Sequence, residues 1–117
     1  IGTADEVDSE AHLDVMTVLP GSGPAYPALM AAAMLDFARK AGLPEAIARR
    51  AVEAVICDGS SLLAGRIETA AATVQTFRDY AGITAAGLNA AEAAGYSTAI
   101  AQALTVALQA CTVPDKA

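Results

Sequence analysis

The stretch PGSGPAYPALMAAAMLDFARKAGLP, residues 20–44, decides the fold of this chain. Its first five residues hold two prolines and two glycines, which predict a break after any helix that precedes them. Residues 24–41 then show no strand-like alternation and predict one long helix, with Pro24 in its first turn. Arg39 and Lys40 suit the negative end of that helix, and Gly42 is a typical terminator. The helix is apolar on nearly all sides, so other elements must surround it.

Capping residues, glycines and prolines divide the rest of the chain in the same way. A first helix is expected to begin at Asp8 or Ser9, after an extended segment at residues 2–6. The expected helices are residues 9–19, 24–41, 44–64, 68–77, 83–94 and 97–111, with a second break at residues 78–82 and the ordered part ending at Pro114. No segment alternates apolar and polar residues over the length of a strand. We therefore expect residues 1–117 to form a single all-α domain of five to six helices.

Alanine is the most unusual feature of the composition. It supplies 30 of the 117 residues, whereas Phe and Tyr together supply only five and Trp none. Small side chains favour helix and let helices approach one another closely. A chain of this length cannot surround every apolar helix by itself, so we expect a twofold homodimer, or a higher oligomer, with a large apolar interface. The alternative is a monomeric, alanine-rich bundle.

Charge, hydropathy and cysteine usage limit the classes of function. The formal net charge is −6 and the seven basic residues are scattered, which argues against binding a nucleic-acid backbone. The longest apolar run, residues 25–35, is too short to cross a bilayer. Cys57 and Cys111 lie in apolar helical patterns without metal or CxxC spacing, so we expect two reduced, buried thiols and a cytoplasmic protein. His12 is the only histidine and is expected at the surface, so the sequence predicts no metal site and no His-based triad.

Two helix starts remain as candidate binding segments, at residues 21–24 and at residues 81–84. The unpaired N–H groups at the start of a helix can bind an anion. Gly82 would let a ligand approach the backbone, and the Thr84 hydroxyl can donate or accept a hydrogen bond. An ordinary capping role for Thr84 is the alternative.

Both segments resemble motifs of the pyrroline-5-carboxylate reductases. Residues 19–26, LPGSGPAY, are similar to the GSGPAY motif of that family, and the long helix after them ends in AGLP at residues 41–44, as it does there. Residues 81–88, AGITAAGL, followed by EAAGY at residues 92–96, are similar to the family's SPGGTT…AGL…LEeaGf signature. The resemblance extends from about Asp5 to Cys111.

The resemblance implies an all-α, interlocked dimerisation domain of the 6-phosphogluconate-dehydrogenase C-terminal-like type. It implies that an N-terminal Rossmann domain, absent from this chain, holds NADP or NAD, and that the whole enzyme reduces the C=N bond of 1-pyrroline-5-carboxylate, or of a related cyclic imine, to make proline. The start at Ile1 agrees with a piece of a longer protein, and we expect these 117 residues alone to be inactive and to bind no cofactor.

The resemblance also assigns roles to individual residues. It places the substrate carboxylate on the backbone N–H groups of Gly82, Ile83 and Thr84, with Thr84 as the catalytic residue near the ring nitrogen. It places Thr17 beside the substrate ring. The cofactor-proximal residues of the first motif would be Ser22, Gly23 and Pro24.

The second motif departs from the family's pattern. Asp79, Tyr80 and Ala81 stand where the family has Ser, Pro and Gly. Asp79 is a negative charge beside the expected carboxylate site; it could cap the fifth helix and compete with the substrate, and Tyr80 could narrow the pocket. We therefore expect either a different imine substrate or weak binding of the usual one. The alternative function is a non-catalytic homodimerisation module descended from this family.

Overall fold

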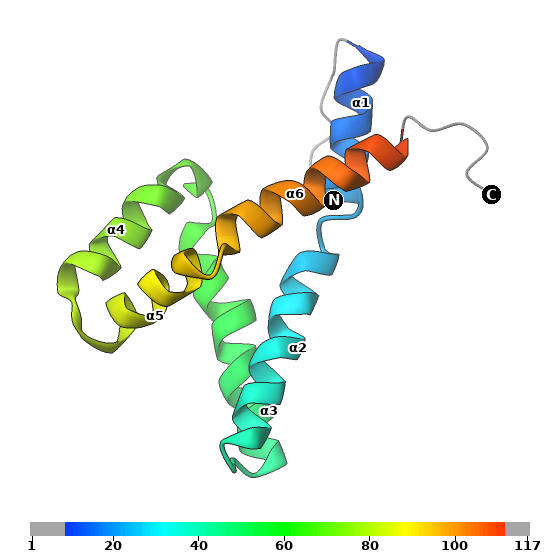
Figure 1. Ribbon diagram of the computed structural model, residues 1–117. Helices are drawn as coiled ribbons and strands as arrows, with labels where there is room; N and C mark the ends of the chain where they lie inside the picture. The colour runs from blue at the N-terminus through cyan, green and yellow to red at the C-terminus, as the bar shows by residue number, and fades with distance from the viewer. Residues whose placement is uncertain (1–8, 112–117) are drawn as a thin grey trace. The chain divides into compact units, whose positions relative to one another are not determined.

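The computed structural model describes residues 9–111, and all regular structure in that range is helical (Figure 1). The predicted all-α fold is therefore confirmed. The chain divides into two compact units. The first contains residues 1–24 and 82–117, and the second contains residues 25–81. The predicted extended segment at residues 2–6, the alternative cap Asp8 and the predicted end at Pro114 lie outside the described residues.

The first unit pairs the beginning of the chain with its last two helices. Helix α1 (Glu10–Met16) continues into the π-helix η1 (Thr17–Gly21). Helices α5 (Gly82–Ala93) and α6 (Tyr96–Cys111) follow one another and are joined by a short turn at Gly95, whose φ is 93°. Helix α6 contacts α5, α1 and η1. Among the described residues of this unit, Val18 and Ala85 are the buried hydrophobic ones.

Local chemistry explains both ends of the first helical segment. Ser9 is the cap, because its hydroxyl oxygen accepts a hydrogen bond from the His12 backbone N–H at 3.2 Å. The predicted break at residues 20–24 is present, but it begins two residues later than expected, at Ser22, since the helical path continues through Gly21. The turn widens there, and the Ser22 N–H bonds the Thr17 carbonyl five residues back at 2.8 Å. A wider turn tolerates a proline ring that would clash with an ordinary α-helix.

The second unit is built on a helical hairpin. Helix α2 (Ala25–Lys40) contacts α3 (Glu45–Glu53) and the π-helix η2 (Ala54–Gly59) (Figure 1). A 3₁₀ turn, η3 (Ser60–Leu63), follows, and then η4 (Ile67–Thr69) and α4 (Ala70–Tyr80). The long predicted helix at residues 24–41 is confirmed to within one residue at each end. Its terminator Gly42 has φ 92°.

Two predicted boundaries in the second unit need correction. The third helix was expected as one element over residues 44–64, but its winding changes after Glu53 to π and then to 3₁₀. Gly59, Ser60 and Ser61 are weak helix formers and lie where the π-helix gives way to the 3₁₀ turn, which accounts for the second of these two changes. The fourth helix was expected to end at Phe77, but α4 continues through Tyr80, because no residue before Ala81 breaks a helix.

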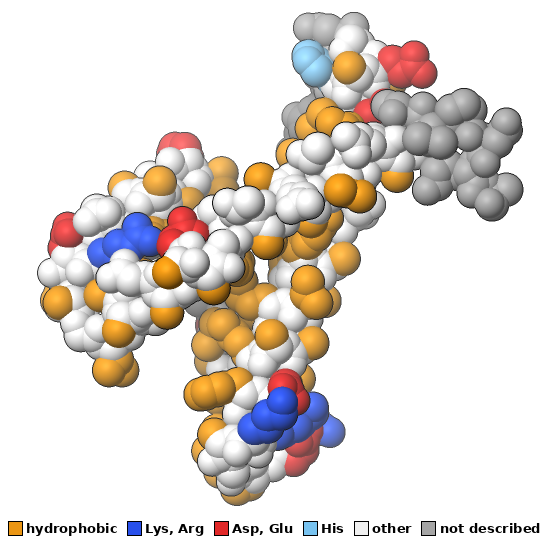
Figure 2. All heavy atoms as spheres, viewed as in Figure 1, with side chains coloured by type: hydrophobic (Ala, Val, Ile, Leu, Met, Phe, Trp, Pro, Cys, Tyr) orange, Lys and Arg blue, Asp and Glu red, His pale blue; other side chains and the backbone are white. Residues whose placement is uncertain are grey.

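The turn between α2 and α3 is closed by charged side chains. The Arg39 Nε and NH2 groups donate to the two carboxylate oxygens of Glu45 at 2.9 and 2.8 Å, and Arg49 Nε donates to Glu45 at 2.9 Å. These hydrogen bonds hold the pKa of Glu45 at about 2, and the bond to Glu45 raises the pKa of Arg39. Figure 2 shows this group of charges at the end of the hairpin, with apolar side chains along the helices.

Few side chains are buried within the chain. Among residues 9–111 the buried hydrophobic residues are Val18, Ala38, Ala48, Val52 and Ala85, so none is larger than valine. Cys57 and Cys111 are free thiols, as predicted, but both are exposed, so the expectation of buried thiols is wrong for the single chain. No helix in the described range is long and apolar enough to span a membrane.

Candidate functional site

The first candidate segment, residues 21–24, begins at the last residue of η1 and is folded back onto that π-helix. The Ser22 N–H donates to the Thr17 carbonyl at 2.8 Å and the Gly23 N–H donates to the Leu19 carbonyl at 2.7 Å. The Thr17 hydroxyl donates to the Leu13 carbonyl at 3.2 Å, so its oxygen keeps only acceptor capacity for a ligand. Thr17, Ser22 and Pro24 are exposed. The structure therefore brings Thr17, Ser22 and Gly23 together through the backbone.

Gly23 is required by this turn for a steric reason. A Cβ atom at this position would clash with the Leu19 carbonyl oxygen, so the backbone would have to move. At Gly21, by contrast, a Cβ atom would make an ordinary contact of 3.5 Å with the Met16 carbonyl oxygen. The tight turn therefore requires glycine at residue 23 but not at residue 21.

The second candidate segment, residues 81–84, contains Ala81 and the start of α5, and the departing residues Asp79 and Tyr80 precede it at the end of α4. Asp79 lies in the last turn of α4, and its Oδ1 atom accepts a hydrogen bond from Gln75 Nε2 at 2.9 Å. The expectation that Asp79 caps the fifth helix is therefore wrong, because Ala81 alone separates the two helices. Tyr80 is 84% exposed. Its ring extends into solvent in the single chain, where it narrows no pocket.

Gly82, Ile83 and Thr84 form the first turn of α5. Ile83 is 92% exposed and Thr84 is exposed, whereas Ala85 after them is buried. Within residues 9–111 the Thr84 hydroxyl has no hydrogen-bond partner, unlike the hydroxyl of Thr76, which bonds the Ala72 carbonyl. The start of α5 thus offers backbone N–H groups and one hydroxyl to a ligand.

No hydrogen bond or ion pair within the described range joins residues 17–24 to residues 82–84. The structure forms each predicted segment locally and does not assemble the two into one pocket. It also describes no group of three His, Cys, Asp or Glu side chains in residues 9–111 that could hold a metal ion.

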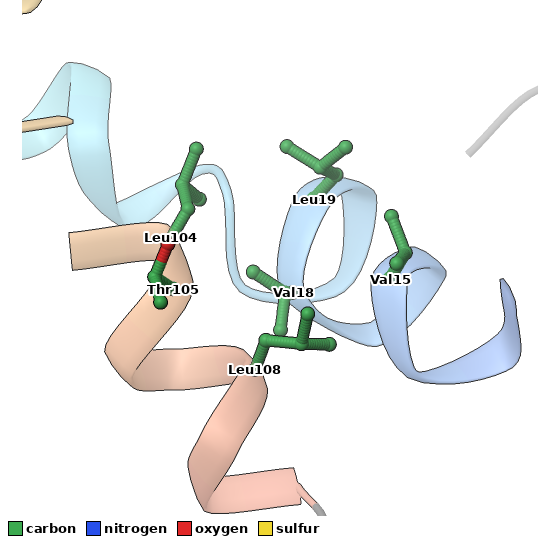
Figure 3. Close-up of a pocket in the computed structure, with 6 residues that line it drawn as sticks. All are labelled: Val15, Val18, Leu19, Leu104, Thr105 and Leu108. Atoms are coloured by element: carbon green, nitrogen blue, oxygen red, sulfur yellow. The ribbon is translucent and has the colours of Figure 1, made fainter. Parts of the chain in front are cut away.

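A small apolar cavity lies elsewhere in the first unit, and the sequence patterns did not indicate it. It has a volume of about 150 Å³ and lies between α6 and the α1–η1 segment (Figure 3). Its lining residues are Val15, Val18, Leu19, Leu104, Thr105 and Leu108. The Thr105 hydroxyl donates to the Ala101 carbonyl at 2.9 Å, so the cavity offers no unpaired donor to a polar ligand.

Many large apolar side chains are exposed on the surface of the described residues. Phe37 is 75% exposed, Leu29 and Leu62 are each 67% exposed, and Ile67 is 70% exposed. Met30 and Phe37 are seven residues apart on α2 and therefore lie on one side of that helix. Exposed apolar groups on this scale mark a protein interface.

The fold and these surfaces define an all-helical oligomerisation domain. The chain matches the family model for pyrroline-5-carboxylate reductase dimerisation over residues 10–112, and it belongs to that family. It is 35% identical over 107 residues to a pyrroline-5-carboxylate reductase of Synechocystis sp., covering 92% of this chain and 40% of the relative. It is 32% identical over 110 residues to a pyrroline-5-carboxylate reductase of Pseudomonas aeruginosa, and this match covers 93% of this chain and 40% of that relative. The chain thus spans about 40% of the length of these relatives. No solved structure matches it.

Proposed function

We propose that the chain associates as a homodimer through the apolar faces of its helices. The exposure of its large apolar side chains, with no buried residue larger than valine among residues 9–111, is the observation that supports this proposal. A partner subunit would cover the side chains that the chain itself leaves in water. Sedimentation equilibrium tests it: we expect twice the chain mass of 11.7 kDa at micromolar concentration, and a monomer at that concentration would overturn the proposal.

We further propose that the domain works within an NAD(P)H-dependent reductase of cyclic imines, with 1-pyrroline-5-carboxylate as the substrate class. The family membership and the two relatives support this proposal. A Rossmann domain N-terminal to residues 1–117 would bind NADP or NAD, and this helical domain would contribute to the substrate site. The whole protein would be cytoplasmic and would serve proline biosynthesis.

The start of α5 is the proposed binding segment. The N–H groups of Gly82, Ile83 and Thr84 would bind the substrate carboxylate, because the positive end of a helix favours an anion. The Thr84 hydroxyl would donate to the ring nitrogen, and its lack of a partner within the described residues suits that role. Thr17 would lie beside the ring, and Ser22, Gly23 and Pro24 beside the nicotinamide.

A kinetic comparison in the full-length protein tests the role of Thr84. Thr84→Val keeps the shape of the side chain and removes the hydroxyl, so we expect kcat to fall about tenfold, the effect of one lost hydrogen bond of about 1.4 kcal/mol. Thr76→Val is the matched control, because Thr76 is also exposed and its hydroxyl is used within α4. Equal activity in the two variants would contradict the role of Thr84.

Asp79 provides a second kinetic test. Its carboxylate is five residues before Thr84 and would repel an anionic substrate. Asp79→Ser should lower KM for pyrroline-5-carboxylate, and an unchanged KM and kcat would refute the repulsion. If the full-length protein shows no imine-dependent oxidation of NADPH or NADH at all, the non-catalytic dimerisation module is the correct function.

A further inference from the structure

The cavity between α6 and the α1–η1 segment is large enough for one aromatic ring (Figure 3). Its volume is about 150 Å³. An aliphatic protein cavity of roughly that volume can stay free of water and bind benzene. Five of the six lining side chains are aliphatic: Val15, Val18, Leu19, Leu104 and Leu108. The sixth is Thr105, whose hydroxyl already donates to the Ala101 carbonyl. The cavity therefore suits a phenyl ring better than a polar group.

The chain carries such a ring on an exposed side chain, Phe37. Phe37 is 75% exposed, whereas the other phenylalanine, Phe77, is 45% exposed and has more of its ring covered already. A tyrosine would bring a hydroxyl group into the aliphatic lining, which costs free energy. A leucine or isoleucine side chain is smaller than the ring and would leave part of the cavity empty. Phe37 is thus the exposed side chain that matches the cavity best.

The length of α2 keeps Phe37 away from the cavity of its own chain. Phe37 lies twelve residues after Ala25, the first residue of α2, so the helical rise places it about 18 Å from the start of the helix. The lining residue Leu19 lies close to that start, because its carbonyl accepts a hydrogen bond from the Gly23 N–H. One continuous helix sets this separation, whatever the placement of the two units. A second copy is therefore the molecule that can present Phe37 to the cavity.

The charges near the ring and near the cavity have opposite signs. Residues 36–50, which include Phe37, contain four basic and two acidic side chains and so carry a net charge of +2. The described part of the first unit contains three acidic side chains and no Lys or Arg. One of the three, Asp14, directly precedes the lining residue Val15. Complementary charges steer two surfaces together and fix their orientation.

We propose that Phe37 of each copy inserts its ring into the cavity of the other copy. Such a contact presupposes the proposed homodimer and specifies which side chain holds it together. A twofold dimer makes the contact twice, because each copy supplies one ring and one cavity. The ring that the single chain leaves in water is then covered by aliphatic side chains of α6 and η1.

Two substitutions remove the contact from opposite sides. Phe37→Ala deletes the ring, and Leu104→Trp fills the cavity. Each should raise the dimer dissociation constant at least about tenfold in sedimentation equilibrium. Val106→Trp is the matched control, because Val106 is on the same helix, is 56% exposed and does not line the cavity, so this variant should dimerise as the unmodified chain does. Far-UV circular dichroism checks the helices, and Leu108→Trp replaces Leu104→Trp if that variant unfolds.

A mixture of the two variants tests whether the contact joins two copies. The ring of a Leu104→Trp copy can enter the open cavity of a Phe37→Ala copy, so the heterodimer keeps one contact and each homodimer keeps none. Native mass spectrometry of an equal mixture should therefore show the heterodimer well above its statistical proportion. A statistical mixture of dimers would overturn the ring-in-cavity contact and leave the homodimer standing. If the unmodified chain is a monomer at micromolar concentration, the proposed homodimer fails and this contact fails with it.

Discussion

Phe37→Asp should convert the proposed homodimer into a monomer without unfolding the chain. The Phe37 side chain is 75% exposed within the chain. A phenylalanine side chain has about 150–250 Å² to bury, so roughly 110–190 Å² remains for a partner to cover. At about 25 cal/mol per Å² this area corresponds to about 3–5 kcal/mol for each subunit. Only part of this burial free energy appears as binding free energy, so we take about 2 kcal/mol for each subunit. Because both subunits lose the contact, the total of about 4 kcal/mol corresponds to about a thousandfold increase in the dimer dissociation constant.

Sedimentation equilibrium across a concentration series measures this effect, and far-UV circular dichroism checks that the helices remain. Lys40→Gln is the matched control, since it lies on the same helix and changes the net charge by the same single unit. If Phe37 were an ordinary surface residue of a monomer, its substitution would change stability by less than about 0.5 kcal/mol and would leave the mass unchanged. A dissociation constant equal to that of Lys40→Gln would refute the assignment of this face to the interface.

Two further predictions concern stability. The pKa of Glu45 is lowered from 4.5 to about 2, so its ion pairs stabilise the hairpin above pH 4.5, and this contribution is lost as the pH falls toward 2. Thermal melts between pH 7 and pH 2 should show a smaller acid-induced loss in Glu45→Gln than in Glu53→Gln on the same helix, and identical profiles would contradict the prediction. Gly23→Ala should lower the melting temperature by about 4 °C or more, because its Cβ meets the Leu19 carbonyl oxygen, whereas Gly21→Ala should have little effect. Equal melting temperatures for Gly23→Ala and Gly21→Ala would show that the turn can accommodate a Cβ atom at residue 23, which would contradict this prediction.

The local sequence determined most of the helix boundaries. Glycine residues at positions 42, 65 and 95 were expected to end helices, and each has positive φ in the structure. These signals are reliable because a left-handed residue stops a helix in any tertiary context. The errors lie where the winding changes without a break, at Pro20 and after Glu53. A π turn has no distinct residue signature, because it differs from an α turn by one inserted residue.

The candidate site was only partly predictable for a different reason. Gly82 and Thr84 were expected at a helix start and are found there, but the positive φ angle of Ala81, 61°, was not expected. Its signal was present, since the resembled motif has glycine at that position. The ion pairs of Glu45 could also have been anticipated from its spacing to Arg49, whereas the bond from Arg39 depends on how the turn folds back.

The packing of α1 and η1 against α6 has a consequence for synthesis on the ribosome. About 80 residues separate the end of α1 from the start of α6. At roughly 5–20 residues per second, the first helix waits on the order of 4–16 s for its partner. The α2–α3 hairpin, whose contacts are close in sequence, can form during that interval. Val18 stays in water meanwhile, so the early chain offers a chaperone the apolar residues of η1 rather than the hairpin.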